Sequence, residues 1–96
     1  MTIDKISTDD EVILKLNGWL DTQSSEQFHE AIESLDEDGK KLVLELSELE
    51  YISSAGIRLL VYAHKKTGGN LSLKNVQSSV MDVLSATGIT KKLKIE

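Results

Sequence analysis

The chain has 96 residues, 40% of them hydrophobic and none of them cysteine, and it carries a formal net charge of −5 at neutral pH. This length suits one domain spanning residues 1–96, which would bury roughly 60–65% of the surface that its unfolded chain exposes. The absence of cysteine excludes disulfides, thiolate zinc sites and cysteine nucleophiles, and no apolar run approaches membrane-spanning length. We therefore expect a cytoplasmic protein without membrane insertion.

The charge is distributed unevenly along the chain. Residues 1–56 hold 4 Lys and Arg against 14 Asp and Glu, whereas residues 57–96 hold 7 against 2. The acidic first part argues against nucleic acid as a ligand, although Lys91, Lys92 and Lys94 could form a local basic patch. Charge runs of this kind are ordinarily solvated surface.

The first forty residues predict a β-hairpin followed by a helix. Apolar residues alternate over 12–16, and a turn separates this strand from a shorter one near 3–6. Ser24 and Gln27 have the spacing of a capping box at a helix start. Apolar residues then recur at helical intervals, namely Phe28, Ala31, Ile32 and Leu35, until Gly39 supplies a C-terminal stop.

The rest of the chain alternates strands and helices. Residues 42–46 form a nearly continuous apolar run, which is typical of a strand covered on both faces. The later elements are a helix with the apolar face Ile57, Leu60, Val61 and His64, a strand over 71–73, a third helix near 79–87 ended by Gly88, and a strand or tail over 93–95. The residues expected in the core are Phe28, Ile32, Leu35, Val43, Leu44, Leu46, Ile57, Leu60 and Leu84.

This element order predicts the fold class α/β. Two strand–helix–strand units require parallel pairing with right-handed crossovers. We therefore expect a mixed β-sheet with a parallel centre and an N-terminal antiparallel hairpin, packed with about three to four helices.

Residues for catalysis are scarce. The two histidines, His29 and His64, do not stand in a metal-binding frame such as H-E-x-x-H, and there is no phosphate-binding glycine loop and no G-x-S-x-G elbow. The sequence alone pairs neither histidine with a serine nucleophile. We expect no enzyme activity, no metal and no cofactor, with His29 exposed and His64 at the boundary of the core.

Two consecutive serines stand where a strand pattern gives way to a helix pattern. A hydroxyl of Ser53 or Ser54 there lies beside backbone N–H groups that the helix leaves unpaired, so it can cap the helix or carry a phosphate. Capping explains one serine but neither the second nor Gly56 in the first turn, because glycine inside a helix costs about 1 kcal/mol. Gly56 therefore indicates that something approaches the backbone closely.

The segment Ser53-Ser54-Ala55-Gly56-Ile57 resembles the helix-opening motif of the STAS domain family, the sulfate transporter and anti-sigma factor antagonist domains. Gly18-Trp19-Leu20-Asp21 is similar to the Gly-Glu-Leu-Asp at the end of the family's second strand. Thr87-Gly88-Ile89 is similar to the Ser/Thr-Gly-Leu that closes its third helix. The three segments keep the order and spacing of the family, and the resemblance covers nearly the whole chain.

The resemblance implies a binding module like the anti-sigma factor antagonists. In that family the domain binds a cognate anti-sigma factor that is also a serine kinase, phosphorylation switches the domain off, and a metal-dependent serine phosphatase reverses the mark. Alignment on the glycine places the phosphorylated residue at Ser54, with Ser53 as a competing acceptor. The alternative is a phosphorylation-independent STAS regulatory subunit of another assembly, such as a transporter.

The chain departs from the family pattern on either side of Ser54. The acidic residue that precedes the phosphoserine is Ser53 here, the hydroxyl residue that follows it is Ala55, and the acidic residue of Gly-Glu-Leu-Asp is Trp19. Trp19 either packs on the core or, if exposed, anchors a partner. The residues expected to contact a partner are Trp19, Asp21, Ser53, Ala55, Gly56 and Arg58.

Overall fold

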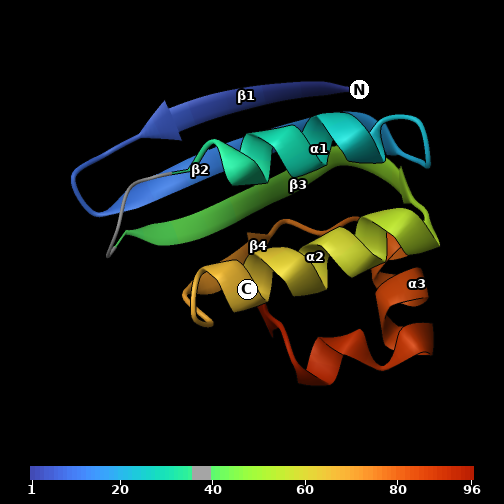
Figure 1. The fold of residues 1–96 in the computed structure, drawn as a ribbon. Helices are drawn as coiled ribbons and strands as arrows, with labels where there is room; N and C mark the ends of the chain where they lie inside the picture. Colours follow the sequence, from blue (N-terminus) through green and yellow to red (C-terminus); the bar gives the residue numbers. More distant parts are fainter. Residues whose placement is uncertain (36–39) are drawn as a thin grey trace.

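The strands of the sheet follow one another in chain order. Figure 1 shows their arrangement with the helices. The computed structural model describes residues 1–35 and 40–96. The strands are β1 (Thr2–Ser7), β2 (Glu11–Leu20), β3 (Lys41–Ile52), β4 (Leu71–Lys74) and β5 (Lys94–Ile95). The helices are α1 (Ser25–Glu33), α2 (Ser54–Lys66), α3 (Ser78–Thr87) and the short 3₁₀ helix η1 (Ile89–Lys91).

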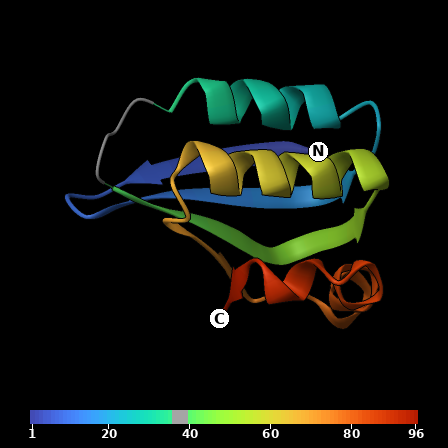
Figure 2. The ribbon, with the colours of Figure 1, turned by 60° about the horizontal axis from the view of Figure 1, so that its bottom comes forward.

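The sheet is mixed, as the sequence predicts. β1 and β2 form an antiparallel hairpin, whereas the β2–β3, β3–β4 and β4–β5 pairs are parallel. Helices α1 and α2 lie side by side over one face of the sheet, and α3 lies on the side of β3 away from α1 (Figure 2). Two hydrogen bonds hold the start of α3 to β3, from Gln77 Nε2 to the Ser47 carbonyl at 2.6 Å and from Ser79 Oγ to the Glu50 carbonyl at 3.3 Å.

The two long strands extend beyond the predicted segments. β2 continues past residue 16 to Leu20, and β3 continues past residue 46 to Ile52. Two register shifts between them, at Lys15/Asn17 and at Gly18/Trp19, insert extra residues into β3 and keep both strand ends paired. The two strands therefore run together to the edge of the sheet where α1 and α2 begin.

The predicted core is confirmed at seven positions and wrong at two. The buried residues are Phe28, Ile32, Val43, Leu44, Leu46, Leu60 and Leu84. Leu35 and Ile57 are only half-buried and pack at the border of the core. Leu35 lies beyond the end of α1, which finishes at Glu33, and the predicted stop at Gly39 lies outside the described residues.

Glu33 of α1 contacts two side chains of α2 on the exposed side of the two helices. Its carboxylate accepts a hydrogen bond from the Tyr62 hydroxyl and lies 3.6 Å from Lys66 Nζ, both on α2, and 3.5 Å from His29 Nε2. These groups are solvent-exposed for the most part, so each pair stabilises the fold by at most about 1 kcal/mol. His29 is exposed and His64 is half-buried, as predicted.

Candidate functional site

The serine pair lies at the edge of the sheet where the parallel strands β2 and β3 end. The Ser53 N–H donates a 2.8 Å hydrogen bond to the Leu20 carbonyl, which ties the end of β3 to the end of β2. Helices α1 and α2 both begin beyond this edge (Figure 1). Ligands of open α/β sheets bind at the carboxyl ends of the strands, so this edge is the part of the fold suited to recognition.

Ser53 and Ser54 have different environments although they are adjacent. Ser53 is the N-cap of α2, with extended dihedral angles of −93° and 172°, and its Oγ accepts a 3.3 Å hydrogen bond from the Gly56 N–H. Ser54 is the first helical residue and is exposed, and its hydroxyl has no hydrogen-bond partner among the described residues. Capping therefore accounts for Ser53 and leaves the Ser54 hydroxyl free.

Gly56 is required by the packing of the protein's own core. A Cβ atom at this position would lie 2.7 Å from Leu20 Cγ and 2.9 Å from Ile52 Cγ1. Both neighbours are fully buried ends of strands, so neither can move away at little cost. The close approach that the glycine indicates is confirmed, and the groups that approach are Leu20 and Ile52. Gly56 itself is buried rather than part of the surface.

Asp21 forms a closed turn with Ser24 at the start of α1. Asp21 Oδ1 accepts a hydrogen bond from the Ser24 N–H at 2.9 Å and lies 2.9 Å from Ser24 Oγ, and Ser24 Oγ accepts one from the Asp21 N–H at 2.9 Å. The hydrogen bonds from the Ser24 backbone and hydroxyl hold the pKa of the Asp21 carboxyl below its usual value. The predicted capping box is wrong, because Ser24 faces Asp21 and makes no side-chain cap to the helix.

Trp19 is exposed, so the alternative in which it packs on the core is wrong. Its side chain is 57% exposed, and the cross-strand neighbour Tyr51 is 44% exposed. The two ring centroids lie 5.2 Å apart. The sequence did not predict Tyr51 as part of this surface. Strand alternation could have indicated that Trp19 and Tyr51 are exposed. Each precedes a buried apolar residue, Leu20 or Ile52, and neighbouring residues of a strand face opposite sides of the sheet.

The exposed side of α2 continues the site away from the serines. Ala55 is half-buried and Arg58 is exposed on the first two turns of the helix.

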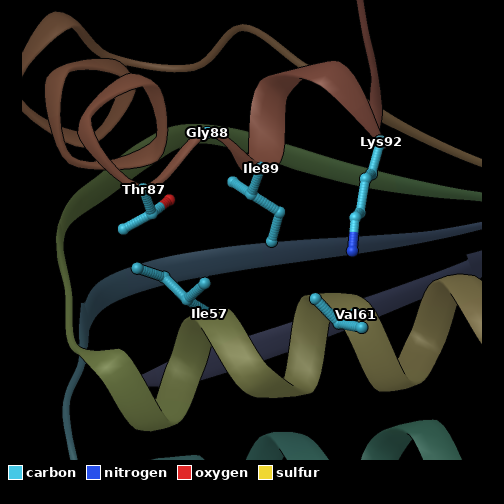
Figure 3. Close-up of a pocket in the computed structure, with 6 residues that line it drawn as sticks. All are labelled: Ile57, Val61, Thr87, Gly88, Ile89 and Lys92. Atoms are coloured by element: carbon cyan, nitrogen blue, oxygen red, sulfur yellow. The ribbon is translucent and has the colours of Figure 1, made fainter.

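Figure 3 shows Ile57 and Val61 of α2 facing Ile89 and Lys92 across a surface pocket of about 220 Å³. This pocket is why Ile57, predicted to be buried, is only half-buried. Its lining is mostly apolar, and Lys92 is the one basic residue among those that line it.

The structure gives no sign of a metal site or a membrane span in the residues it describes. No group of three or more His, Asp or Glu side chains among residues 1–35 and 40–96 is arranged to hold a metal ion. No helix in the same residues is both long enough and apolar enough to cross a bilayer.

The chain matches the model of the family described as the STAS domain over residues 2–96. The relatives include BtrV of Bordetella bronchiseptica, named as an anti-sigma factor antagonist, which is 33% identical over 92 residues, or 92% of this chain and 78% of BtrV. The anti-sigma-B factor antagonist of Bacillus subtilis is 25% identical over 92 residues, covering 93% of this chain and 84% of that protein.

A solved structure from Thermotoga maritima supports the same relationship. It is named as an anti-sigma factor antagonist and matches this fold with a TM-score of 0.86 at 28% sequence identity. The match covers 97% of this chain and 84% of the Thermotoga chain.

Proposed function

The chain belongs to the STAS domain family, and we propose that it is an anti-sigma factor antagonist-like binding module that phosphorylation of Ser54 switches off. Its partner in this proposal is a cognate anti-sigma factor with serine kinase activity, and a metal-dependent serine phosphatase removes the phosphate. The chain is then the substrate and binding partner of these enzymes, acting in the cytoplasm without contacting nucleic acid or a membrane. The two curated relatives, both named as antagonists, support this proposal.

One observation carries the proposal: Ser53 caps α2 and Ser54 does not. A kinase can reach the Ser54 hydroxyl without breaking the cap, because that hydroxyl is exposed and makes no hydrogen bond within the described residues. The unpaired N–H groups and the positive end of the helix dipole then favour the phosphate product. The proposed contact surface around it comprises Trp19, Asp21, Ser53, Ala55 and Arg58, with Gly56 packed beneath it.

The electrostatics of phosphorylation are large enough for a switch. A phosphate adds about −1.5 to −2 charge at pH 7. The helix N-terminus stabilises the phosphate by roughly 0.3–2 kcal/mol, whereas burying the dianion against a partner costs several kcal/mol. A net penalty of about 4 kcal/mol weakens binding roughly a thousandfold. Asp21 adds like-charge repulsion from the same edge of the sheet, because its hydrogen bonds with Ser24 favour the ionised carboxylate.

The test is to map phosphate on the protein isolated from its native host. We expect intact-mass analysis to show a singly phosphorylated form and peptide mapping to place the phosphate on Ser54. Ser54→Ala should abolish the modification, and the matched variant Ser53→Ala should retain it. Phosphate on Ser53, with Ser54→Ala still fully modified, would overturn the assignment.

The second candidate function is a STAS regulatory subunit of another assembly, such as a transporter, without phosphorylation. It is favoured by Ser53 and Ala55, which stand where the resembling motif has an acidic residue and a hydroxyl residue. Protein that carries no phosphate in growing, starved and stressed cells, while still co-purifying with a partner, would support this alternative.

A further inference from the structure

The aromatic pair Trp19 and Tyr51 has an unusual position for a chain with only four Phe, Trp and Tyr residues. The two side chains stand opposite each other on β2 and β3, with their ring centroids 5.2 Å apart and tilted by 41°. The next residues along the two strands, Leu20 and Ile52, are buried in the core. The pair therefore faces away from the core, on an open part of the sheet surface.

The open face beside this pair carries an acidic group that forms no salt bridge with any residue of the ranges 1–35 and 40–96. Glu48 pairs with Asn17, which lies two residues before Trp19 and so shares its face. Glu48 is exposed, and no salt bridge between described residues involves it. Glu45, three residues earlier on β3, differs because it stands opposite Lys15 and accepts a 2.7 Å hydrogen bond from the Ser47 N–H.

We propose that Trp19, Tyr51 and Glu48 form a receptor for an arginine side chain of the partner protein. An indole ring is the strongest cation–π acceptor among the side chains, and a guanidinium group stacks on aromatic rings while its N–H groups bind a carboxylate. The net charge of −10 over residues 1–56 favours the approach of a basic segment to this chain. A lysine ammonium would lack the planar stacking and fit less well.

The receptor lies at the same edge of the sheet as the serine pair. Ser53 follows Tyr51 by two residues, and its N–H binds the carbonyl of Leu20, the neighbour of Trp19. A single partner can therefore cover both places, with an arginine on the aromatic pair and another segment over Ser54. This inference rests on the proposed function for the existence of a protein partner, but the receptor can be tested without that partner.

The test is an NMR titration of the ¹⁵N-labelled, unphosphorylated chain with the probe N-acetyl-Gly-Arg-Gly-amide. The chain has one tryptophan, so a single indole N–H signal reports directly on Trp19. We expect saturable shifts of this signal and of the backbone amides of residues 48–52. The isosteric, uncharged citrulline peptide should bind at least about fivefold more weakly, and the lysine peptide about two- to threefold more weakly.

Three variants locate the binding. Trp19→Ala, followed on the backbone amides, should remove saturable binding, and Glu48→Gln should raise the dissociation constant about threefold. Glu30→Gln removes the same charge from an exposed position of α1, on the helix-covered side of the molecule, and should leave the constant unchanged. Equal binding of the arginine and citrulline peptides, or an unchanged constant in Trp19→Ala, would overturn the receptor.

The possible outcomes separate the two proposals. Concentration-dependent shifts of the indole signal without any peptide would show that a second copy of the chain covers the pair, and would also overturn the receptor. Specific arginine binding by a chain that is never phosphorylated in its host would leave the receptor standing and reject the phosphorylation switch. Phosphate on Ser54 without arginine binding would do the reverse.

Discussion

At the scale of single residues, backbone geometry assigns different tasks to two identical side chains. Ser53 is extended, so its hydroxyl can reach the Gly56 N–H three residues further on. Ser54 has already entered the helix, and its side chain is exposed. The sequence predicts that one serine caps the helix, but the choice depends on where the helix begins, a boundary that propensity does not locate to a single residue.

Gly56→Ala tests the packing at the start of α2. Alanine is favoured over glycine by about 1 kcal/mol in a helix, so propensity alone predicts a gain. The new Cβ would lie within 3.0 Å of Leu20 and Ile52, and the overpacking should outweigh that gain, for a net loss of about 1–3 kcal/mol of unfolding free energy in urea. Ser54→Ala, on the same turn but exposed, should change it by less than about 0.5 kcal/mol. A stabilised Gly56→Ala would mean that the strand ends can move apart.

Asp21 should make part of the stability depend on pH. Because the pKa of its carboxyl is lower in the folded state than its usual value, the Asp21–Ser24 hydrogen bonds stabilise the fold fully above about pH 4, the ordinary Asp range. That contribution is lost as the pH falls through the folded-state pKa. The stability difference between the wild type and Asp21→Asn, measured by urea titration, should therefore shrink below about pH 4. A difference that stays constant from pH 7 to pH 3 would contradict this assignment.

Carboxyl-detected NMR can follow the same group directly. Ser24→Ala removes the hydroxyl and keeps the backbone N–H, so the pKa of Asp21 should move back toward its usual value without reaching it.

At the scale of elements, one side-chain hydrogen bond caps the first turn of α2, from the Gly56 N–H to Ser53 Oγ. Replacing Ser53 with Ala leaves the Gly56 N–H without its side-chain acceptor and should cost about 0.5–2 kcal/mol of unfolding free energy. Ser53→Gly keeps an acceptable N-cap conformation, so it should lower the unfolding free energy by only about a few tenths of a kcal/mol relative to the wild type. Chemical denaturation of the three proteins makes the comparison, and equal losses in Ser53→Ala and Ser54→Ala would show that the cap is shared.

The strands show where sequence periodicity is sufficient and where it fails. The run Leu42–Leu46 predicts the first half of β3, whose apolar residues are buried. The second half keeps Leu49 and Ile52 in the core at a spacing of three, which strict alternation forbids and the two register shifts permit. Such shifts depend on the pairing of β3 with β2, so one strand's sequence does not reveal them.

The start of α1 shows a competition that the sequence leaves undecided. Ser24 and Gln27 have the spacing of a capping box, yet Ser24 binds Asp21 and also lies 2.7 Å from the Trp19 carbonyl. A carboxylate three residues earlier offers Ser24 a charge-assisted hydrogen bond, which is stronger than a neutral one to the helix. The Gly-Trp-Leu-Asp segment therefore fixes both the end of β2 and the beginning of α1.

At the scale of the whole molecule, the alternation of strands and helices predicts the mixed sheet, because a parallel pair needs a long crossover between its strands. The sequence also predicts the serine site, because Ser53 and Ser54 stand where one strand pattern ends and a helix pattern begins. It does not predict which face of the sheet remains uncovered by helices. Trp19 is exposed because α1 and α2 lie on the opposite face, a consequence of packing between distant elements (Figure 2).

Ser54→Asp tests the switch as a property of the whole molecule. Ser54→Asp places one negative charge where phosphate carries nearly two, with fewer acceptor oxygens, so it should mimic phosphorylation only in part. The fold should tolerate it, since a carboxylate suits the N-terminus of α2, and its thermal melt should match the wild type to within a few degrees. Binding to the cognate kinase should weaken by at least about 2 kcal/mol, roughly thirtyfold, because an uncompensated carboxylate is buried at the interface.

Calorimetric titration of the kinase with the wild type, Ser54→Asp and Ser54→Ala makes this comparison. Ser54→Ala should bind like the wild type, because the free hydroxyl of Ser54 makes no hydrogen bond within the described residues that its loss would break. If all three proteins bind equally while their melts are unchanged, Ser54 lies outside the interface. A charge at Ser54 weakens binding only if the interface buries it. Equal binding would therefore favour the second candidate function, a regulatory subunit without phosphorylation.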